Sequence, residues 1–314
     1  MTSSTTVRTR PAYRPYAATV VDVQRLSPHF VRVTFSGSEF EFFGTAGLDQ
    51  RVKLILPLAD GSLSDLGQRD QAAVDAGDWY TIWRELPQDE RGPLRTYTVR
   101  RIDAATGCLS VDFVVHHDPG PAGAWAERAA VGDEIIVVGP DQRSEGSRLG
   151  LDWHPGTARR LVLAGDETAA PAICSILESL DGSHDVDAFI EVPTAADCLT
   201  LGVPASVRVT WLVRGDRGHG EALTAAVSAW SESAGDVLAR AAAPRRQEVA
   251  EIDVDQDLLW DSPEDSDGEF YAWIAGEAAM VKGLRRHLVQ GCGVDRKRVA
   301  FMGYWRLGQS ERQE

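Results

Sequence analysis

The sequence lacks several features that mark common classes of protein. No run approaches the roughly 18 consecutive apolar residues of a membrane-spanning helix. Its four cysteines lie far apart and form no C-x-x-C pair, which speaks against a zinc site or a chain-borne iron–sulfur cluster. The G-x-G-x-x-G fingerprint of dinucleotide-binding folds is also absent. We therefore expect a cytoplasmic protein with reduced thiols and no stable membrane insertion.

Basic charge is in deficit. The chain has 32 Lys and Arg against 47 Asp and Glu, a formal net charge of −15. This balance excludes nonspecific nucleic-acid binding and attraction to anionic lipid, both of which need excess cations. An anionic small ligand would need a local basic pocket. Residues 1–15 lack the apolar stretch of a signal peptide, so we expect a flexible lead-in.

The length of 314 residues indicates about two domains, and short strand-like runs dominate the first half. They are Ala18–Gln24, Phe30–Gly37, Arg51–Pro57, Arg95–Arg101, Cys108–His116 and Glu134–Gly139. So many short strands predict a closed β-barrel rather than a helical layer. The stretch 62–83 interrupts the pattern, and we predict an insertion or a long loop there.

Strands and helices alternate in the second half, which predicts a parallel sheet with helices on its faces. The strands are Arg160–Ala164, Asp187–Val192, Val207–Val213, Phe270–Ala275 and Arg298–Tyr304. The helices are Ala170–Leu180, Glu221–Ser233 and Ala278–Gln290. A Gly-, Ser- and Pro-rich stretch at 139–157 marks the boundary. We predict a barrel domain over 16–145, an α/β domain over 155–308 and a C-terminal tail over 309–314.

One segment concentrates the acidic charge. Residues 248–269 carry ten acidic residues and no Lys or Arg. This pattern indicates a solvated insert near 245–269 in the α/β domain. The alternative is a docking site for a basic partner.

Two neighbouring segments of the first half carry residue types suited to a flavin nucleotide. In Arg95–Thr98, an aromatic ring on a strand can pack beside a flat ring, while the arginine can pair with a pyrophosphate. An ordinary amphipathic strand is the alternative. The strand Asp112–His116 then leads through Gly120 into small residues and a helix start, whose N–H groups suit a phosphate. Trp125 either covers an adenine or packs inward.

The adjacent histidines His116 and His117 raise a second question, because such a pair can bind metal. Side chains of neighbouring strand residues point to opposite faces, and no third ligand is evident nearby. We therefore favour a cofactor contact for His116 and expect no resident metal.

In combination and order, these segments resemble the siderophore-interacting proteins, which are FAD-dependent ferric-siderophore reductases of the ferredoxin-reductase-like group. The family patterns R-x-Y-T-x-R, D-x-x-x-H and G-P-A-S-x-W-A match Arg95–Arg100, Asp112–His116 and Gly120–Ala126. Gly123 stands where the family often has Ser, so one hydroxyl ligand to the FAD phosphate would be lost while the backbone N–H remains.

Further matches extend the resemblance from about Tyr16 to Gly308. The patterns G-D-E-T-A-x-P-A-I, W-x-A-G-E and G-Y-W-R-x-G match Gly165–Ile173, Trp273–Glu277 and Gly303–Gly308. The resemblance implies an N-terminal antiparallel Greek-key β-barrel that binds FAD and a parallel-sheet α/β domain that binds NADH or NADPH. Ferredoxin is an alternative electron donor.

The resemblance also implies two sets of cofactor contacts. The expected FAD contacts are Arg95, Thr96, Tyr97, Thr98, Asp112, Phe113, Val114, Val115, His116, Ala122, Gly123, Ala124 and Trp125. The expected nicotinamide contacts are Asp166, Glu167, Thr168, Ala169, Ala275, Gly276 and Glu277. The second set lies at strand-to-helix turns, where open α/β sheets place ligands. For Glu167, a helix N-terminal carboxylate favoured by the helix dipole is an equal alternative.

An acidic protein that receives an anionic iron complex must gather cations locally. The resemblance places Lys53, Arg143 and Arg306 around the open face of the flavin, although each has the alternative of an ordinary surface cation. Tyr304 and Trp305 either shield the flavin or pack between domains. Two further arginines, Arg214 and Arg217, are candidates for the 2′-phosphate of NADPH.

Together these observations predict a flavoprotein that passes electrons from NAD(P)H through FAD to a ferric siderophore, releasing Fe(II) in the cytoplasm. The cofactor carries the chemistry, so no catalytic side chain is expected. Two alternatives remain: a general NAD(P)H-flavin reductase for another acceptor, and a noncatalytic siderophore-binding protein.

Overall fold

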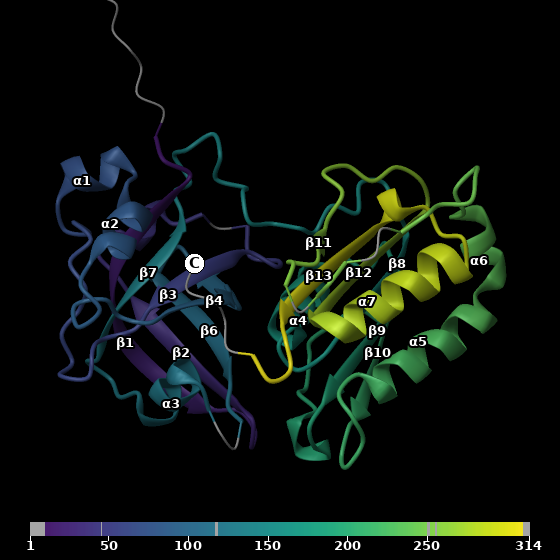
Figure 1. Cartoon of the computed structure of the whole chain (residues 1–314), viewed down its shortest axis with the longest axis horizontal. Coiled ribbons are helices and arrows are strands. Elements are labelled where there is room, and N and C mark those ends of the chain that lie inside the picture. Colours follow the sequence, from purple (N-terminus) through teal and green to yellow (C-terminus); the bar gives the residue numbers. More distant parts are fainter. Residues whose placement is uncertain (1–9, 45, 117–118, 250–251, 255, 310–314) are drawn as a thin grey trace, which may run out of the picture. The chain divides into compact units, whose positions relative to one another are not determined.

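The computed structural model describes residues 10–44, 46–116, 119–249, 252–254 and 256–309 (Figure 1). The expected terminal tails, His117 and part of the acidic segment therefore lie wholly or partly outside the described residues. The chain forms two compact units, each with its own sheet. The N-terminal unit comprises the chain up to Gln24 together with Val31–Gly150, and the C-terminal unit comprises Arg25–Phe30 and the chain from Leu151 onward.

The N-terminal unit is built on one curled antiparallel sheet of seven strands in the order β4-β3-β7-β1-β2-β6-β5. The strands are β1 (Tyr13–Arg25), β2 (Phe30–Ser36), β3 (Arg51–Ile55), β4 (Leu94–Thr98), β5 (Arg101–Asp103), β6 (Cys108–Val114) and β7 (Glu134–Pro140). The outermost strands β4 and β5 are separated in the chain only by Val99 and Arg100. One segment thus links the two ends of the sheet, and the predicted barrel-type fold is confirmed.

Alternation of apolar and polar residues explains why these segments form strands. Val31, Val33 and Phe35 of β2 are buried in the same core as Val111 and Phe113 of β6. In a strand, every second side chain faces one side of the sheet, so this spacing directs a single apolar face inward.

For residues 62–83, the long-loop alternative was wrong in the second half, where the chain forms the helices α1 (Gln71–Ala76) and α2 (Trp79–Glu85). That this stretch is an insertion stays a prediction. The Asp70 carboxylate caps α1 by accepting from the Ala72 N–H at 2.9 Å, and Gly77 ends it in a left-handed conformation. Trp83 of α2 is fully buried and packs against β3 and β4 through Ile55 and Leu94. The helices thus cover the outer face of the sheet, and they are too short to show a clear helical period.

The C-terminal unit has a six-stranded sheet in the order β10-β9-β8-β12-β13-β11. Its strands are β8 (Arg160–Gly165), β9 (Asp185–Val192), β10 (Val207–Val213), β11 (Trp260–Asp261), β12 (Phe270–Glu277) and β13 (Val299–Trp305). All are parallel except β11, which pairs antiparallel with β13. This confirms the predicted α/β fold, while the short β11 was not predicted.

The helices of this unit are α4 (Ala170–Ser179), α5 (Glu221–Ser233), α6 (Gly235–Arg240) and α7 (Ala278–Arg285), and α7 continues into a π-helical turn over Arg286–Gly291. Figure 1 shows α5 and α7 on the same face of the sheet. Leu223, Val227 and Leu284 of these helices share a core with Ile274 of β12. The central strands are almost continuously apolar, as expected where a parallel sheet is covered on both faces.

The described part of the acidic segment is anchored to its unit at several points, one of which is β11. Leu259 is buried, and the Asp261 carboxylate pairs with Arg285 of α7 at 2.8 Å. Around β11, most described residues of 248–269 have no regular structure.

None of the described helices combines the length and the apolar character that crossing a membrane requires.

The cover formed by α2 gives a stability prediction. Replacing Trp83 with Ala should lower the free energy of unfolding by about 3–5 kcal/mol, because it leaves a cavity under the helix. Its indole N–H also donates to the Gly92 carbonyl at 3.0 Å. Trp83→Phe keeps most of the buried area and should cost clearly less. Urea unfolding of both variants would measure the difference, and equal losses would contradict this packing role.

Candidate functional site

In the N-terminal unit, the start of α3 (Pro121–Arg128) forms an open anion-binding position after β6. Among the described residues no side chain caps this helix, and Gly120 at its N-cap position is extended. The first N–H groups of a helix have no acceptor within it, so those of Ala122 and Gly123 are available to a ligand. A Cβ on Gly120 would meet nothing within 4 Å, which leaves open space in front of this end.

Gly123 lies in the first turn of α3, in a tighter place. A Cβ there would approach the Pro119 Cβ to 3.0 Å. A serine would therefore need Pro119 to shift, which gives a steric reason for glycine at this position.

The strand β4 presents its side chains to two different surroundings. Tyr97 lies opposite Val52, and its half-buried ring is 4.6 Å from that of Phe113, centroid to centroid. Arg95 is half-buried on the same face and donates to the Leu94 carbonyl at 2.7 Å. Thr96 lies on the other face, as does Thr98.

Several predicted FAD contacts are internal to the unit. Asp112 is buried, and its carboxylate receives a two-pronged bond from Arg32 of β2, at 2.6 and 2.8 Å. Arg100 approaches the same carboxylate at 3.5 Å. The sequence motif did not predict the contact with Arg32, because this residue reaches Asp112 only through the pairing of β2 with β6.

Phe113 and Trp125 are also buried, and the Trp125 ring stacks on Phe35 at 6.1 Å. Trp125 therefore packs inward, which was the alternative interpretation for this residue. Around them, Val115 is buried and Val114 half-buried, whereas His116 is exposed.

These residues fit a flavin nucleotide. The uncapped start of α3 and the open space at Gly120 suit a pyrophosphate, and Arg95 adds a cation with a planar fork. Tyr97 supplies an aromatic ring supported from below by Phe113. Phe113 and Trp125 pack behind Tyr97 and hold its ring in place. Direct contact between these two residues and the cofactor stays a prediction.

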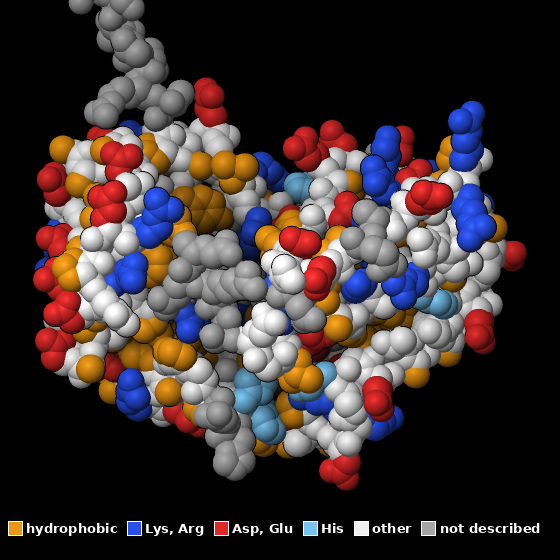
Figure 2. All heavy atoms as spheres, viewed as in Figure 1, with side chains coloured by type: hydrophobic (Ala, Val, Ile, Leu, Met, Phe, Trp, Pro, Cys, Tyr) orange, Lys and Arg blue, Asp and Glu red, His pale blue; other side chains and the backbone are white. Residues whose placement is uncertain are grey.

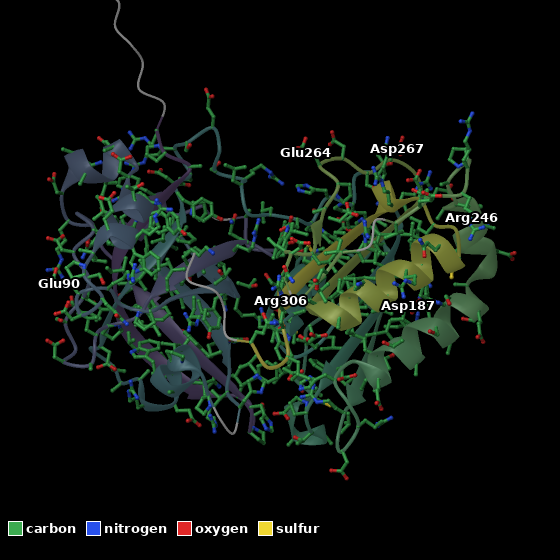
Figure 3. All side chains as sticks on the ribbon, viewed as in Figure 1. Glu90, Asp187, Arg246, Glu264, Asp267 and Arg306 are labelled. Atoms are coloured by element: carbon green, nitrogen blue, oxygen red, sulfur yellow. The ribbon has the colours of Figure 1, made fainter. Side chains whose placement is uncertain are left out.

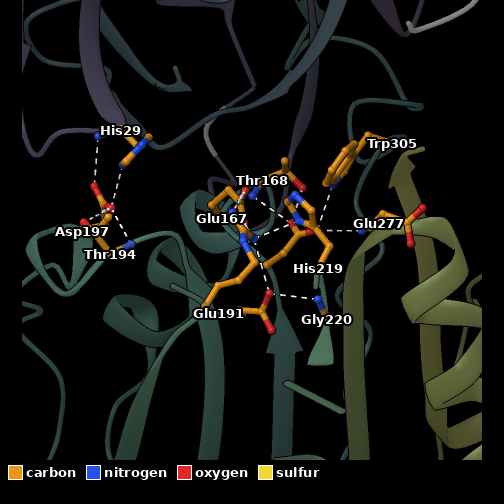
Figure 4. A network of polar contacts seen from close by, with 12 residues as sticks. His29, Glu167, Thr168, Glu191, Thr194, Asp197, His219, Gly220, Glu277 and Trp305 are labelled. Atoms are coloured by element: carbon orange, nitrogen blue, oxygen red, sulfur yellow. Dashed lines mark hydrogen bonds and ion pairs between the residues drawn. The ribbon is translucent and has the colours of Figure 1, made fainter. Parts of the chain in front are cut away.

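In the C-terminal unit, the carboxylate of Asp166 joins the ends of three strands. Figure 4 labels three residues that donate to it, Thr168, Glu277 and Trp305. Asp166 follows β8 and accepts from the Thr168 N–H at 2.9 Å, from the Glu277 N–H at the end of β12 at 2.7 Å and from the Trp305 indole N–H at the end of β13 at 2.8 Å. The chain runs from β8 to β9 and β10 on one side of the sheet, whereas β12 lies on the other. Asp166 thus lies at the switch point where open α/β sheets bind ligands.

Gly276 makes this arrangement possible. Its φ is +143°, and a Cβ there would approach the Asp166 Oδ2 atom to 2.6 Å. Any side chain would displace the carboxylate, which explains the glycine in the W-x-A-G-E pattern. The next residue, Glu277, caps α7 by accepting from the Met280 N–H at 2.9 Å.

Burial of the Asp166 carboxylate and the negative charge of Glu167 raise the pKa of Asp166 to about 6, although the bonds from Thr168 and Trp305 oppose this shift.

Glu167 is the centre of a second buried network. Arg214 donates to both of its carboxylate oxygens, at 2.9 and 2.8 Å, and to Glu191 at 3.3 Å. Glu191 in turn accepts from the Gly220 N–H at the start of α5. The carboxylate of Glu167 is thereby occupied, and the geometry favours a supporting role for it. Sequence reasoning missed Glu191, because an acidic residue inside an apolar strand carries no motif.

This network also separates the two arginines considered for a 2′-phosphate. Arg214 is buried between carboxylates, whereas Arg217 is exposed and folds back on the carbonyls of Val213 and Arg214. His219, also unanticipated, accepts from the Arg214 guanidinium at 2.9 Å through Nδ1, and its ring lies 5.0 Å from that of Trp305.

The three predicted substrate cations lie in different settings. Lys53 donates to the Thr96 hydroxyl at 2.6 Å. Arg143 forms two bonds to Asp141, at 2.8 and 2.6 Å, and its guanidinium lies 3.7 Å above the Phe42 ring. Arg306 belongs to the C-terminal unit and donates to a backbone carbonyl of the acidic segment. That all three serve one substrate stays a prediction.

The two aromatic residues beside Arg306 have separate partners. Trp305 is held by Asp166, while Tyr304 stacks on Trp260 at 5.7 Å.

Among the residues that the structure describes, no group of three His, Cys, Asp or Glu side chains is arranged to hold a metal ion.

The raised pKa of Asp166 gives a prediction with a definite sign. An exposed aspartate has a pKa near 3.9, so the folded chain binds more protons at this site than the unfolded chain between about pH 4 and 6, and stability from this group falls as pH rises there. Asp166→Asn removes that dependence. Its unfolding free energy relative to wild type should therefore rise by about 2 kcal/mol between pH 4 and 7.

Asp181→Asn is the matched control. Bonds from the Ser183 hydroxyl and N–H lower the pKa of this exposed carboxyl, so its relative stability should change in the opposite direction over the same pH range. Urea unfolding at several pH values would decide, and a flat difference curve for Asp166→Asn would contradict the assignment.

Comparison with known proteins agrees with this geometry. Residues 19–144 match the model of the siderophore-interacting FAD-binding domain, and residues 158–308 match that of the siderophore-interacting protein. An uncharacterized protein of Mycobacterium tuberculosis is 34% identical over 96% of this chain and 93% of its own length. The ferric vibriobactin reductase ViuB of Vibrio cholerae is 27% identical over 91% and 87%. The NADPH-dependent ferric-chelate reductase of Escherichia coli is 26% identical over 95% of each chain.

Solved structures give the same result. A siderophore utilization protein from T. fusca has a TM-score of 0.65 and 28% identity, with 97% of each chain covered. A ferredoxin reductase of carbazole 1,9a-dioxygenase shares the fold at a TM-score of 0.57 and 16% identity, covering 93% of this chain and 70% of the other. The predicted fold, family and FAD cofactor are confirmed. The chain belongs to the siderophore-interacting protein family of FAD-binding proteins.

Proposed function

We propose that this protein is an FAD-dependent ferric-siderophore reductase with NADH or NADPH as its electron donor. One hydride carries two electrons, so each NAD(P)H oxidised reduces two Fe(III) ions to Fe(II) and releases one proton. One observation carries the proposal. The start of α3 follows β6 and offers free N–H groups, and β6 belongs to the same sheet as Tyr97, within the domain that matches the FAD-binding model. Two relatives named as ferric reductases support it.

In the N-terminal unit, the chain would bind and orient the cofactor. The N–H groups of Ala122 and Gly123 and the helix dipole of α3 attract the pyrophosphate, and Arg95 neutralises part of its charge. Tyr97, whose ring packs on Phe113, would lie beside the flavin ring. Bound FAD supplies the redox chemistry, since it accepts a hydride and passes electrons on one at a time.

In the C-terminal unit, the chain would bind the nicotinamide nucleotide at the switch point. Asp166 holds Thr168 and Glu277 in fixed positions at the ends of β8 and β12. Because Arg214 is occupied by Glu167, Arg217 is the better candidate for a 2′-phosphate, and NADPH would depend on it. Ferredoxin remains the alternative donor.

Recognition of the iron complex would rest on charge. Ferric siderophores present anionic oxygen ligands, which bind hard Fe(III) tightly and Fe(II) much more weakly. Lys53, Arg143 and Arg306 would attract such a complex, and reduction would release the iron. Because NAD(P)H is the donor, we place the reaction in the cytoplasm.

The purified protein should be yellow, and its flavin absorbance should bleach when NADH or NADPH is added without oxygen. A ferric siderophore should then restore the oxidised spectrum while Fe(II) appears in a ratio of about two per nicotinamide, as the electron count of hydride transfer requires. Stopped-flow absorbance with a ferrous chelator would follow both steps. Bleaching without reoxidation by the siderophore would defeat the acceptor assignment.

The same experiment separates the alternatives. A general flavin reductase would turn over quinones or simple ferric chelates at least as fast as siderophores. A noncatalytic binding protein would bind the siderophore tightly without flavin. The half-buried Tyr97 and the open start of α3 favour a flavoprotein over that second alternative.

The charge account gives a separate prediction. Lys53→Ala and Arg306→Ala should each raise KM for an anionic ferric complex by about five- to tenfold, because a cation near the binding position is lost. For a neutral ferric complex, KM should change little. Arg84→Ala, which removes an exposed cation of α2, is the matched control. Equal effects on both complexes would contradict this account.

A further inference from the structure

The C-terminal unit has a cavity of about 220 Å³ at the amino end of its parallel sheet. The cavity lies among the starts of β8 and β12, the end of α6 and the residue before β13, and its charged side chains are Arg160, Arg240, Glu269 and Arg298. Because β8 spans six residues, this position is roughly 20 Å from Asp166 at the other end of the strand. It is thus separate from the switch point.

Of the three arginines, Arg160 is already neutralised. It pairs with Asp185 at 3.1 Å and with Asp187, which is labelled in Figure 3. Its charge is therefore committed to the edge of the sheet.

Arg298 is held in the cavity without a counter-charge. Its guanidinium lies against the backbone of Gly268, where a Cβ would approach the Arg298 Cζ to 2.8 Å. Gly268 also has a φ of +105°, so a side chain there is disfavoured both by the contact with Arg298 and by the backbone conformation. With the residues that the structure describes, Arg298 makes one long bond, 3.4 Å to the Arg240 carbonyl, and no ion pair.

Arg240 closes the cavity from the end of α6. Arg240 pairs with Glu269, with 3.9 Å between Nε and Oε2, and both side chains are mostly exposed. Such a pair contributes little, so most of the charge of Arg240 is available.

The surroundings add more cations to this end of an acidic chain. The loop after α6 is tied to the segment before β13 by bonds such as Asp295 N–H to the Ala241 carbonyl at 3.0 Å. Together these segments also carry Arg245, Arg246, Arg296 and Lys297. In Figure 2, basic side chains gather near the end of α6, and Figure 3 labels Arg246 beside this helix.

We propose that this cavity is a binding site for a small oxyanion, held between the guanidinium groups of Arg240 and Arg298. Planar guanidinium forks match the oxygen pairs of phosphate and carboxylate groups. The volume lies below the roughly 300–1,000 Å³ of pockets for drug-sized ligands, which favours an ion such as pyrophosphate or citrate over a nucleotide. A bound ion would join α6 to the starts of β12 and β13 and raise the melting temperature of the protein.

Isothermal titration of the flavin-loaded protein with pyrophosphate, and separately with citrate, tests this proposal. Arg298→Gln and the more exposed Arg240→Gln should each weaken binding about tenfold, the value of one charged hydrogen bond. Glu269→Gln should tighten binding, because it removes the competing carboxylate. Arg246→Gln, a cation of the same loop outside the cavity lining, should change affinity less than about twofold.

Absence of saturable binding by the wild type at constant ionic strength would overturn the proposal. Equal loss in Arg246→Gln and Arg240→Gln would overturn it too, because binding would then be diffuse attraction to the basic surface. At a fixed concentration, pyrophosphate should raise the melting temperature of the wild type clearly more than that of Arg240→Gln. Flavin content and ferric reduction should be unchanged in all these variants, so failure here is distinguishable from failure of the proposed reductase activity.

Discussion

The carboxylate of Asp166 is the interaction on which the functional end of the C-terminal unit depends. A buried negative charge is costly unless it is well bonded, and here it receives donors from the ends of three different strands. The bond from Glu277 fixes the turn that starts α7, and the bond from Trp305 fixes the last residue of β13. Gly276 is required because nothing larger fits beside the carboxylate. One side chain thus aligns the whole strand-end surface at which a nucleotide would bind.

The same logic recurs in two other networks. Glu191 and Glu167 share Arg214 and together hold the start of α5 beside the end of β8. In the N-terminal unit, Asp112 is held by Arg32 and approached by Arg100. Removing one partner of such a buried pair leaves an uncompensated charge and is strongly destabilising. Part of the large acidic content of this chain is therefore structural, and several of its arginines are unavailable to an anionic substrate.

The sequence predicted the strands and helices with clear periods. The bounds of β10 and α5 agree with the structure to the residue, because long alternating or helical patterns are robust. The two helices over 71–85 were not predicted, because six or seven residues form less than two helical turns and show no clear periodicity. Among the site residues, motif matching located Asp166 and Gly276 at the switch point. It could not show that Glu167 and Asp112 are occupied by arginines, because Arg214 and Arg32 reach them only through tertiary contacts.

The bent segment from β4 to β5 has a consequence for how the N-terminal unit behaves without its cofactor. Its first part pairs with β3 and its last part with β6, which are near opposite ends of the sheet. This segment therefore connects the two ends of the sheet, and Arg95 and Tyr97 belong to it. The pairing of β4 with β3 joins residues 39 to 47 positions apart in the chain, and such long-range contacts form slowly in folding. A cofactor bound at this position would stabilise the segment that links the two ends of the sheet. Binding of the flavin and completion of the fold would then be coupled.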